Sequence, residues 1–387
     1  MKAPMPDAAT PAETAEQMVS GSPAATVRVL MVAGGTGGHI FPALAVAEEL
    51  RRRSGQNKDR PYEILFLGTG RGLEERVIPA AGFGLRKISG AGLKGIGGWK
   101  RVRNLLVLPR SAFQAASVLR EFRPHVVLGL GGYIAGPAML MAWLLNIPTV
   151  LIEPNAIPGF TNRILAPFVR AAAVAFAETA EYYGSKGRVT GNPIRAAFAL
   201  VPPRKYQPPF TILVLGGSLG AGAINDCVVA SLNLLPREGT LPRFIHQSGE
   251  ADYNKVRQAY QAQGIPAEVH AFIEDVPAAL AQADLVISRA GGNAVAELAA
   301  AGKACLLIPF PGAADQHQLA NARAMERAGA ARVIEQKDLS PERLQAEIQS
   351  LIASPDGIEN LELAARAFAR PNAAAEIANL VEELAAR

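Results

Sequence analysis

Near the amino end of the chain, a strand-like run of residues is followed by Gly34-Gly35-Thr36-Gly37-Gly38-His39. Four glycines let backbone N–H groups approach a ligand closely, and the helix start behind them favours an anion or a sugar hydroxyl. A tight strand-to-helix turn, the simpler interpretation, needs fewer glycines. The loop differs from a dinucleotide fingerprint, because Ile40 stands at the third glycine position and Gly68-Thr69 stand where an acidic residue should end the second strand.

His39, one of five histidines, directly follows this loop. A histidine at the mouth of a cleft can take a proton from an attacking hydroxyl near neutral pH, so His39 is a candidate general base. A histidine at a helix start can equally bind the backbone or a substrate. The sequence leaves these two interpretations open.

Two loops in the second half of the chain have the same character. Gly216-Gly217-Ser218-Leu219-Gly220-Ala221 joins a strand to a helix, and the Ser218 hydroxyl with neighbouring N–H groups can hold a diphosphate. The alternative is a hinge turn between domains. In Arg289-Ala290-Gly291-Gly292-Asn293-Ala294-Val295-Ala296-Glu297, the glutamate lies about one turn into a helix, where it can accept two ribose hydroxyls. The alternative is a surface glutamate favoured by the helix dipole.

A third polar loop, Asp315-Gln316-His317-Gln318, follows Pro309-Phe310-Pro311-Gly312. Amide side chains on a loop after a strand suit the recognition of sugar hydroxyls. Asp315 can also serve as the N-cap of a helix that starts here.

The sequence lacks the signatures of several other chemistries. It contains no D-x-D to ligate a metal-bound nucleotide-sugar and no G-x-x-x-x-G-K-[ST] loop of an ATPase. Cys227 and Cys305 are far apart and belong to no C-x-x-C or histidine cluster, which disfavours a disulfide framework or a structural zinc site and fits a reducing cytosol. We therefore expect neither a metal nor a cofactor.

These loops must be positioned by the apolar segments around them. Short apolar strands alternate with helices in the first half, which predicts a parallel sheet covered on both faces. The expected strands are residues 27–33, 62–67, 125–129 and 149–152, and the expected helices are residues 43–53 and 136–146. In the second half the expected strands are residues 210–215, 243–246, 285–288 and 304–308, with a helix over residues 294–301.

Both halves thus open with strand, glycine loop and helix, and a proline-rich segment separates them at residues 201–209. We predict two doubly wound α/β domains that face each other across a cleft, with ligands bound beyond the carboxyl ends of the strands. The predicted organisation is a disordered tail (1–25), a first domain (26–195), a linker (196–209), a second domain (210–363) and a C-terminal helix (364–387).

Composition agrees with this organisation. The chain has 387 residues, of which 49% are apolar, which is enough to form the cores of two domains of ordinary size. Only 19% of the residues are charged, which disfavours long disordered segments and a coiled coil. The tail has no apolar run before a cleavage site, so it is not a signal peptide. Residues 126–152 carry no charge, but glycines and prolines interrupt them, so their helical piece is shorter than the ~20 residues that cross a bilayer.

Basic side chains dominate residues 86–124, with Leu93, Ile96 and Trp99 interleaved and Glu121 the one acidic residue. Basic and apolar residues together suit an anionic membrane surface. The alternatives are a solvated helix face with a buried apolar side and nucleic-acid binding. The net charge of only +5 and the absence of a nucleic-acid motif disfavour nucleic acid.

Taken in order, these motifs resemble the peptidoglycan N-acetylglucosaminyltransferase family, often called MurG. The resemblance runs from about residue 27 to the C-terminus and includes further segments at residues 129–133, 153–155, 191–195, 246–249, 272–275 and 315–321. It implies a GT-B fold and the inverting transfer of N-acetylglucosamine from UDP-N-acetylglucosamine to the C4 hydroxyl of the muramyl group in lipid I, giving lipid II and UDP. It also implies a role in cell-wall biogenesis, cell shape and division.

The resemblance also implies roles for single residues. The acceptor-side catalytic pair is His39 and Tyr133. Ile273 would contact uracil through its backbone, Glu297 the ribose, Ser218 the diphosphate and Gln318 the sugar. The full set of donor-binding positions is Thr36, Gly37, Gly38, Asn155, Arg195, Ser218, Ile273, Gly292, Asn293, Ala294, Val295, Ala296, Glu297 and Gln318.

The chain departs from the family pattern at three positions: Ala294 replaces a frequent threonine, Ile152 a frequent histidine and Pro154 a frequent glutamine. The alternatives are a related GT-B enzyme that glucosylates diacylglycerol and a non-catalytic scaffold that binds UDP-sugar. The expected partners are lipid I on an undecaprenyl diphosphate, an anionic membrane surface and other cell-wall synthesis proteins. The expected location is peripheral, on the cytoplasmic side of the inner membrane.

Overall fold

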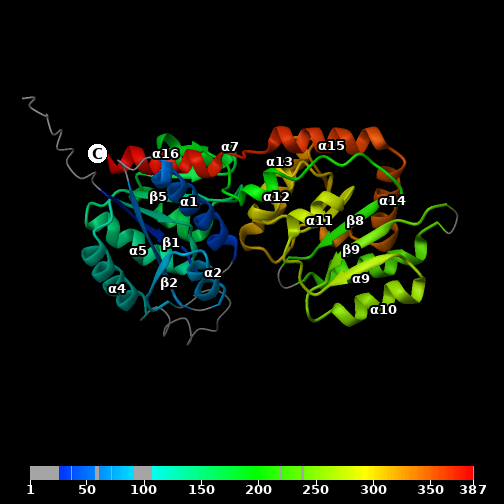
Figure 1. Cartoon of the computed structure of the whole chain (residues 1–387), viewed down its shortest axis with the longest axis horizontal. Coiled ribbons are helices and arrows are strands. Elements are labelled where there is room, and N and C mark those ends of the chain that lie inside the picture. Colours follow the sequence, from blue (N-terminus) through cyan, green and yellow to red (C-terminus); the bar gives the residue numbers. More distant parts are fainter. Residues whose placement is uncertain are drawn as a thin grey trace, which may run out of the picture.

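The computed structural model describes residues 26–35, 37–56, 61–70, 72–90, 107–217, 220–236 and 239–386. The predicted tail, Thr36, Ser218 and residues 91–106 of the basic stretch lie outside these ranges. Within them the chain forms two parallel sheets flanked by helices, and the two units lie next to each other (Figure 1). The predicted two-domain α/β class is confirmed.

The first sheet has the strand order β3-β2-β1-β4-β5-β6-β7. Its strands are β1 (Val27–Val32), β2 (Tyr62–Gly68), β3 (Gly84–Lys87), β4 (Val126–Gly129), β5 (Thr149–Glu153), β6 (Ala171–Val174) and β7 (Gly187–Val189). Its helices are α1 (Gly37–Gln56), α2 (Glu74–Ala80), α4 (Val107–Phe122), α5 (Gly132–Leu144), α6 (Phe160–Leu165) and α7 (Ala177–Tyr183). Val29 and Met31 pack with α1, whereas Leu30 and Val32 pack with α4 and α5, as the two-residue period of a strand requires.

The second sheet has the order β10-β9-β8-β11-β12-β13. Its strands are β8 (Thr211–Leu215), β9 (Arg243–Gln247), β10 (Ala267–His270), β11 (Leu285–Ser288), β12 (Cys305–Leu307) and β13 (Arg332–Val333). The helices of this half are α8 (Ala196–Ala199), α9 (Gly222–Ser231), α10 (Tyr253–Gln263), α11 (Val276–Gln282), α12 (Gly292–Ala300), α13 (His317–Arg327), α14 (Pro341–Ile352) and α15 (Pro355–Phe368). Short 3-10 helices are η1 (Ala166–Phe168), η2 (Gly184–Lys186), η3 (Leu232–Leu234), η4 (Ala314–Gln316) and η5 (Gln336–Asp338).

Each sheet has a topological switch point at the first strand of its domain. Strand β1 lies between β2 and β4, and β8 lies between β9 and β11. The chain therefore adds strands first on one side of β1 or β8 and then on the other side. Ligands of doubly wound sheets bind beyond the carboxyl ends of the strands at this point. The loops after β1 and β8 are the two glycine loops, and the loops after β4 and β11 begin at residues 130 and 289.

The C-terminal chain connects the two domains a second time. Residues 364–387, expected as one helical stretch, form the end of α15 and then α16 (Ala373–Ala385). The break lies before Pro371, because a residue that precedes proline avoids the helical conformation. Helix α15 runs along the second domain, whereas α16 lies on α1 of the first, where Ile377 and Val381 join the apolar core (Figure 1).

Among the residues that the structure describes, no helix combines the length and the apolar character needed to cross a membrane. Cys227 and Cys305 are both buried with free thiols.

Candidate active site

The first glycine loop turns sharply between β1 and α1. Gly35 has a φ of +92°, which a residue with a side chain rarely adopts, and Gly37 and Gly38 open the helix. The N–H of Gly35 donates a hydrogen bond of 2.8 Å to Oε2 of Glu74. This loop therefore needs glycine for its shape and a buried partner to hold it.

The ring of His39 is fixed by the same loop. Its Nδ1 lies 3.3 Å from the carbonyl oxygen of Gly34, and because a carbonyl only accepts, Nδ1 carries the proton and Nε2 keeps its lone pair. Burial lowers the pKa of His39, and the Gly34 carbonyl partly offsets this. The imidazole is thus neutral at neutral pH, with one nitrogen able to accept a proton.

Tyr133 follows Gly132, the residue that approaches the ring of His39. It stands in the first turn of α5, directly after Gly132, and a Cβ at Gly132 would lie 3.4 Å from Cε1 of His39. The tyrosine ring covers Gly90, where a Cβ would lie 2.8 Å from it. The loops after β1 and β4 therefore meet at His39 and Gly132, and the Tyr133 ring extends from this meeting point over Gly90.

Glu74, at the start of α2, is a site residue that sequence reasoning missed. It is fully buried and accepts hydrogen bonds from the Thr69 N–H (2.5 Å), the Thr69 hydroxyl (2.6 Å) and the Gly70 N–H (2.6 Å), besides that of Gly35. The sequence signal was a glutamate at a helix start just after Gly68-Thr69. In the sequence this loop stands out only because it lacks the acidic residue of a dinucleotide site.

Asn155 lies at the seam between the domains. Its N–H and side-chain amide donate to the buried carboxylate of Glu153 (3.1 Å each), whose pKa burial raises. Its Oδ1 accepts from Nδ2 of Asn321 in α13 (3.1 Å), and Oδ1 of Asn321 accepts from the Ala156 N–H (2.8 Å). Asn321 is fully buried, so the predicted donor residue Asn155 is held by both domains.

In the second domain, the glycine loop is linked to Ile273 through Gln247 at the end of β9. Gln247 donates from Nε2 to the Gly217 carbonyl (2.8 Å) and accepts the Ile273 N–H at Oε1 (2.9 Å). Because the Ile273 N–H is already hydrogen-bonded, a backbone contact to uracil can come only from the Ile273 carbonyl oxygen. Sequence reasoning assigned no role to Gln247.

The N-terminus of α12 meets the first domain directly. A Cβ at Gly292 would lie only 2.4 Å from the Pro154 carbonyl oxygen, so only glycine allows this approach. Asn293 donates from Nδ2 to the Gly37 carbonyl (3.3 Å), and its Oδ1 accepts from Nδ2 of Asn192 (2.8 Å). The predicted donor-binding helix and the predicted acceptor-side loop thus lie in contact.

Glu297 follows one turn later on the same helix. Burial raises its pKa to about 7, against a smaller lowering by the charge of Arg195. Arg195 is exposed, and its guanidinium lies over the rings of Phe198 (5.0 Å to the centroid) and Phe41 (5.8 Å). These two predicted donor residues therefore lie within electrostatic reach across the seam.

The predicted sugar-binding residue Gln318 braces the loops around it. Its Oε1 accepts from the N–H groups of Phe310 (3.0 Å) and Ala290 (3.3 Å). The interpretation of Asp315 as a helix N-cap is wrong: Gln316 occupies that position, and the Asp315 carboxylate pairs with Arg163 of α6 at 2.5 Å. Both Asp315 and Gln316 have positive φ, which turns the aspartate toward the first domain.

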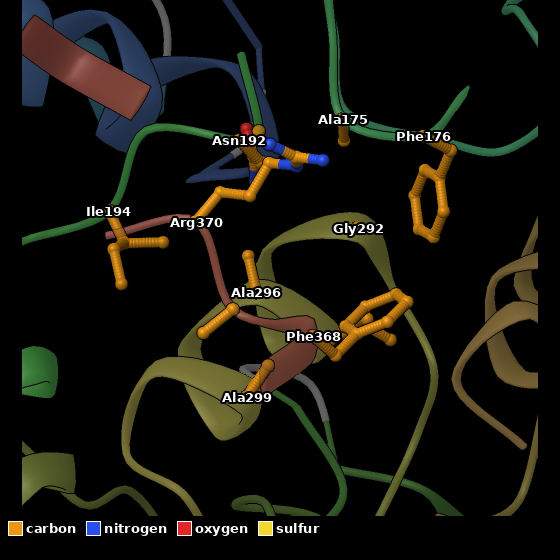
Figure 2. Close-up of a pocket in the computed structure, with 12 residues that line it drawn as sticks. Ala175, Phe176, Asn192, Ile194, Gly292, Ala296, Ala299, Phe368 and Arg370 are labelled. Carbon is orange, nitrogen blue, oxygen red and sulfur yellow. The ribbon is translucent and has the colours of Figure 1, made fainter. Parts of the chain in front are cut away.

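Residues 292–297 divide between two surroundings. Gly292, Ala296 and the buried Val295 line a small pocket between the two domains, whereas Asn293 and Glu297 do not line it. Figure 2 shows Arg370 next to Asn192 in this pocket, with Phe176 and Phe368 on its other side. The centroids of those two rings are 6.2 Å apart. Any donor contact by Val295 must come from its backbone.

In the described part of the chain, no group of three or more His, Cys, Asp or Glu side chains is arranged to hold a metal ion.

Comparison with known proteins agrees with this architecture. Residues 29–174 match the glycosyltransferase family 28 N-terminal domain, and residues 211–380 match its C-terminal domain. The UDP-N-acetylglucosamine--N-acetylmuramyl-(pentapeptide) pyrophosphoryl-undecaprenol N-acetylglucosamine transferase of Anaeromyxobacter sp. (strain Fw109-5) is 45% identical, covering 93% of this chain and 94% of its own. The transferase of the same name from Syntrophus aciditrophicus (strain SB) is 44% identical, over 91% of this chain and 97% of its own.

Among solved structures, MurG of Acinetobacter baumannii superimposes with a TM-score of 0.76 at 32% identity, covering 92% of this chain and 99% of that one. The GT-B fold and the family resemblance drawn from the motifs are confirmed. The chain belongs to glycosyltransferase family 28 and, within it, to the MurG family of N-acetylglucosaminyltransferases.

Proposed function

We propose that this chain transfers N-acetylglucosamine from UDP-N-acetylglucosamine to the C4 hydroxyl of the muramyl group of lipid I, with inversion, in the cleft between its two sheets. Membership of the transferase family carries the choice of substrates. The contact of Asn293 with Gly37 supports a site between the domains, because it joins the start of α12 to the start of α1. Two helix N-termini at two switch points suit a donor diphosphate on one side and a sugar hydroxyl on the other.

The second domain holds the donor. The Glu297 carboxylate accepts the two ribose hydroxyls, and Arg195 lies close enough to favour its charged form. Helix α9, behind the Gly217 loop, and helix α12 direct their N-termini toward the diphosphate. As the bond to UDP breaks, these fixed dipoles, with the Ser218 hydroxyl expected beside them, stabilise the charge that develops on the leaving group.

The first domain activates the acceptor. The acceptor hydroxyl oxygen forms a bond to the anomeric carbon from the side opposite UDP, the electron pair of the old glycosidic bond leaves with the diphosphate, and configuration inverts. Nε2 of His39 takes the hydroxyl proton, since Nδ1 already donates to Gly34. Tyr133 borders the same space and orients the muramyl group.

Exposed apolar side chains suit docking of the first domain on a membrane surface. They gather on α4, α5 and α6, which pack in that order: Phe113, Leu140, Trp143, Leu144, Phe160 and Ile164. Helices α4 and α5 lie in the part of the first domain turned away from the second (Figure 1). Helix α6 reaches the cleft, because its Arg163 pairs with Asp315.

The basic stretch at residues 94–110, most of which lies outside the described ranges, would extend this surface. Docking through both would place the cleft beside the headgroup of a lipid-linked acceptor. Anionic lipid on the cytoplasmic side of the cell membrane is the surface that such a mixture of cations and apolar groups fits.

Radiolabelled UDP-N-acetylglucosamine tests the assignment when it is offered with a lipid I analogue or with diacylglycerol. We expect label in the lipid I product alone, and its loss in His39→Gln with donor binding retained. Label in diacylglycerol would identify a different lipid glycosyltransferase. Binding of the donor without label in either lipid would identify a scaffold.

A further inference from the structure

The peptide group between Gly34 and Gly35 is hydrogen-bonded at both ends. Its N–H, which belongs to Gly35, donates to Oε2 of Glu74 (2.8 Å). Its carbonyl, which belongs to Gly34, accepts from Nδ1 of His39 (3.3 Å). One planar amide therefore connects a fully buried carboxylate to the histidine of the cleft.

We propose that Glu74 is a positioning residue for the transfer reaction, acting on His39 through the Gly34–Gly35 peptide group. This inference rests on the proposed role of His39 as the base. The carboxylate holds the peptide so that the Gly34 carbonyl faces Nδ1, which fixes the histidine as its Nδ1–H tautomer and leaves Nε2 to receive the proton.

The two carboxylate oxygens of Glu74 have separate tasks. Oε1 accepts from Thr69 and Gly70, which fastens the loop between β2 and α2, whereas Oε2 accepts from Gly35. Each of these contacts requires an acceptor, and only a carboxylate offers one on both sides. A negative charge at the N–H end polarises the amide and makes the carbonyl at its other end a stronger acceptor.

The same arrangement assists the reaction as it proceeds. When Nε2 of His39 takes the acceptor proton, the ring becomes an imidazolium and its Nδ1–H bond to Gly34 strengthens. The Glu74 carboxylate packs directly against this peptide group, because a Cβ at Gly34 would lie 2.8 Å from Oε2 of Glu74. The carboxylate thus stabilises the charge on His39 without touching the substrate.

Glu74→Gln is the informative variant, because it keeps the shape of the side chain but can accept on one side only. The amide oxygen can keep Thr69 and Gly70, which turns the amide NH2 toward the N–H of Gly35, where two donors oppose each other. The peptide must then rotate or withdraw, and the Gly34 carbonyl loses its alignment with His39. Glu75→Gln, on the exposed neighbour that pairs with Lys87, is the matched control.

Histidine side-chain ¹⁵N spectra and steady-state kinetics give the readouts. In the parent protein above pH 8 we expect His39 as the Nδ1–H tautomer, and in Glu74→Gln a shift toward the Nε2–H tautomer. We expect kcat to fall about 10- to 100-fold, the range typical when a partner behind an oriented histidine is lost, with the donor KM unchanged. Glu75→Gln should resemble the parent in both measurements.

A folded Glu74→Gln variant with the parent tautomer and kcat would overturn the inference, and a fall in kcat with an unchanged tautomer would reduce Glu74 to a structural clamp. If the variant does not fold, the spectrum of the parent protein still tests the proposal. An Nε2–H tautomer of His39 in the parent would contradict a hydrogen bond from Nδ1 to the Gly34 carbonyl. Retained activity in His39→Gln would instead refute the base role, whatever the tautomer of the parent.

Discussion

At the scale of single residues, burial favours the neutral forms of Glu297 and His39 by moving their pKa values in opposite directions. The pKa of Glu297 rises to about 7, and that of His39 falls below its ordinary value of 6.5. At neutral pH the histidine can therefore accept a proton, while the glutamate is close to its titration midpoint. The two groups should affect different kinetic constants.

The first prediction concerns Glu297 and the donor. Protonation removes the charge that strengthens its bonds to ribose, so the donor KM should rise as the pH falls through about 7. Glu297→Gln should flatten this dependence, and Glu297→Ala should raise the donor KM roughly 10- to 150-fold, equivalent to ~1.5–3 kcal/mol. The exposed Glu359→Ala on α15 is the control. Unchanged donor affinity by calorimetric titration in Glu297→Ala would disprove the ribose contact.

The second prediction concerns the acidic limb of kcat. The neutral form of His39 is the active one, and burial lowers its pKa below the ordinary 6.5, so the acidic limb of kcat should be centred below pH 6.5. His39→Gln should lower kcat by roughly 10²- to 10⁴-fold and leave donor affinity intact. A kcat limb centred above pH 7 would contradict this assignment.

At the scale of elements, the N-termini of α1 and α12 lie at the proposed site, and α16 completes the apolar core of the first domain. Helix α16 follows the second domain in sequence but packs on α1, where Arg53 pairs with Glu382 at 3.0 Å and donates to the Ala375 carbonyl at 2.9 Å. The first domain therefore depends on the last residues of the chain for a complete apolar face.

The third prediction follows from this packing. Ile377→Ala removes a fully buried side chain from the first domain's core and should lower the free energy of unfolding by about 2–5 kcal/mol. Leu363→Ala on α15, whose side chain is 58% exposed, should change it far less. Chemical denaturation of the two variants measures the difference. Equal effects would mean that α16 contributes no core contact in solution.

The fourth prediction concerns the basic stretch. Replacing Lys94, Lys100, Arg101 and Arg103 together should weaken binding to anionic vesicles by about 4 kcal/mol at low salt, at ~1 kcal/mol for each cation. Added salt should shrink the effect through Debye screening. Transfer to a short-chain, water-soluble acceptor should barely change. A variant that still co-sediments like the parent, or that fails equally on the soluble acceptor, would refute membrane docking.

At the scale of the whole molecule, the two domains meet through polar contacts around the cleft. Asn155 with Asn321, Asn192 with Asn293 and Arg163 with Asp315 each join a residue of the first domain to one of the second. The residues that form these contacts lie beside the proposed substrate positions, so the relative placement of the domains and the geometry of the site are coupled.

The fifth prediction concerns metal. The sequence contains no D-x-D to hold a metal-bound diphosphate, and the N-termini of α9 and α12 can stabilise the leaving group instead. Turnover should therefore survive saturating EDTA. Loss of activity in the chelator, restored by magnesium or manganese, would contradict this.

Local pattern was sufficient for the glycine loops and the strands that lead into them. Residues 27–32 and 211–215 are β-branched apolar runs that end in glycines, so both switch points could be predicted. Strand β6 could not, because Ala171-Ala172-Ala173 has little intrinsic preference for a strand. It is a strand because β5 and β7 pair with it on either side.

The sequence by itself determined the two doubly wound domains, the family and the positions of the glycine loops, because those features depend on the types and spacing of neighbouring residues. Tertiary structure alone decided which distant residues meet. Glu74 reaches Gly35, Asn321 reaches Asn155, and α16 returns to the first domain, each across many residues of chain. A buried polar group must find a partner wherever the fold brings one, and no local pattern records that choice.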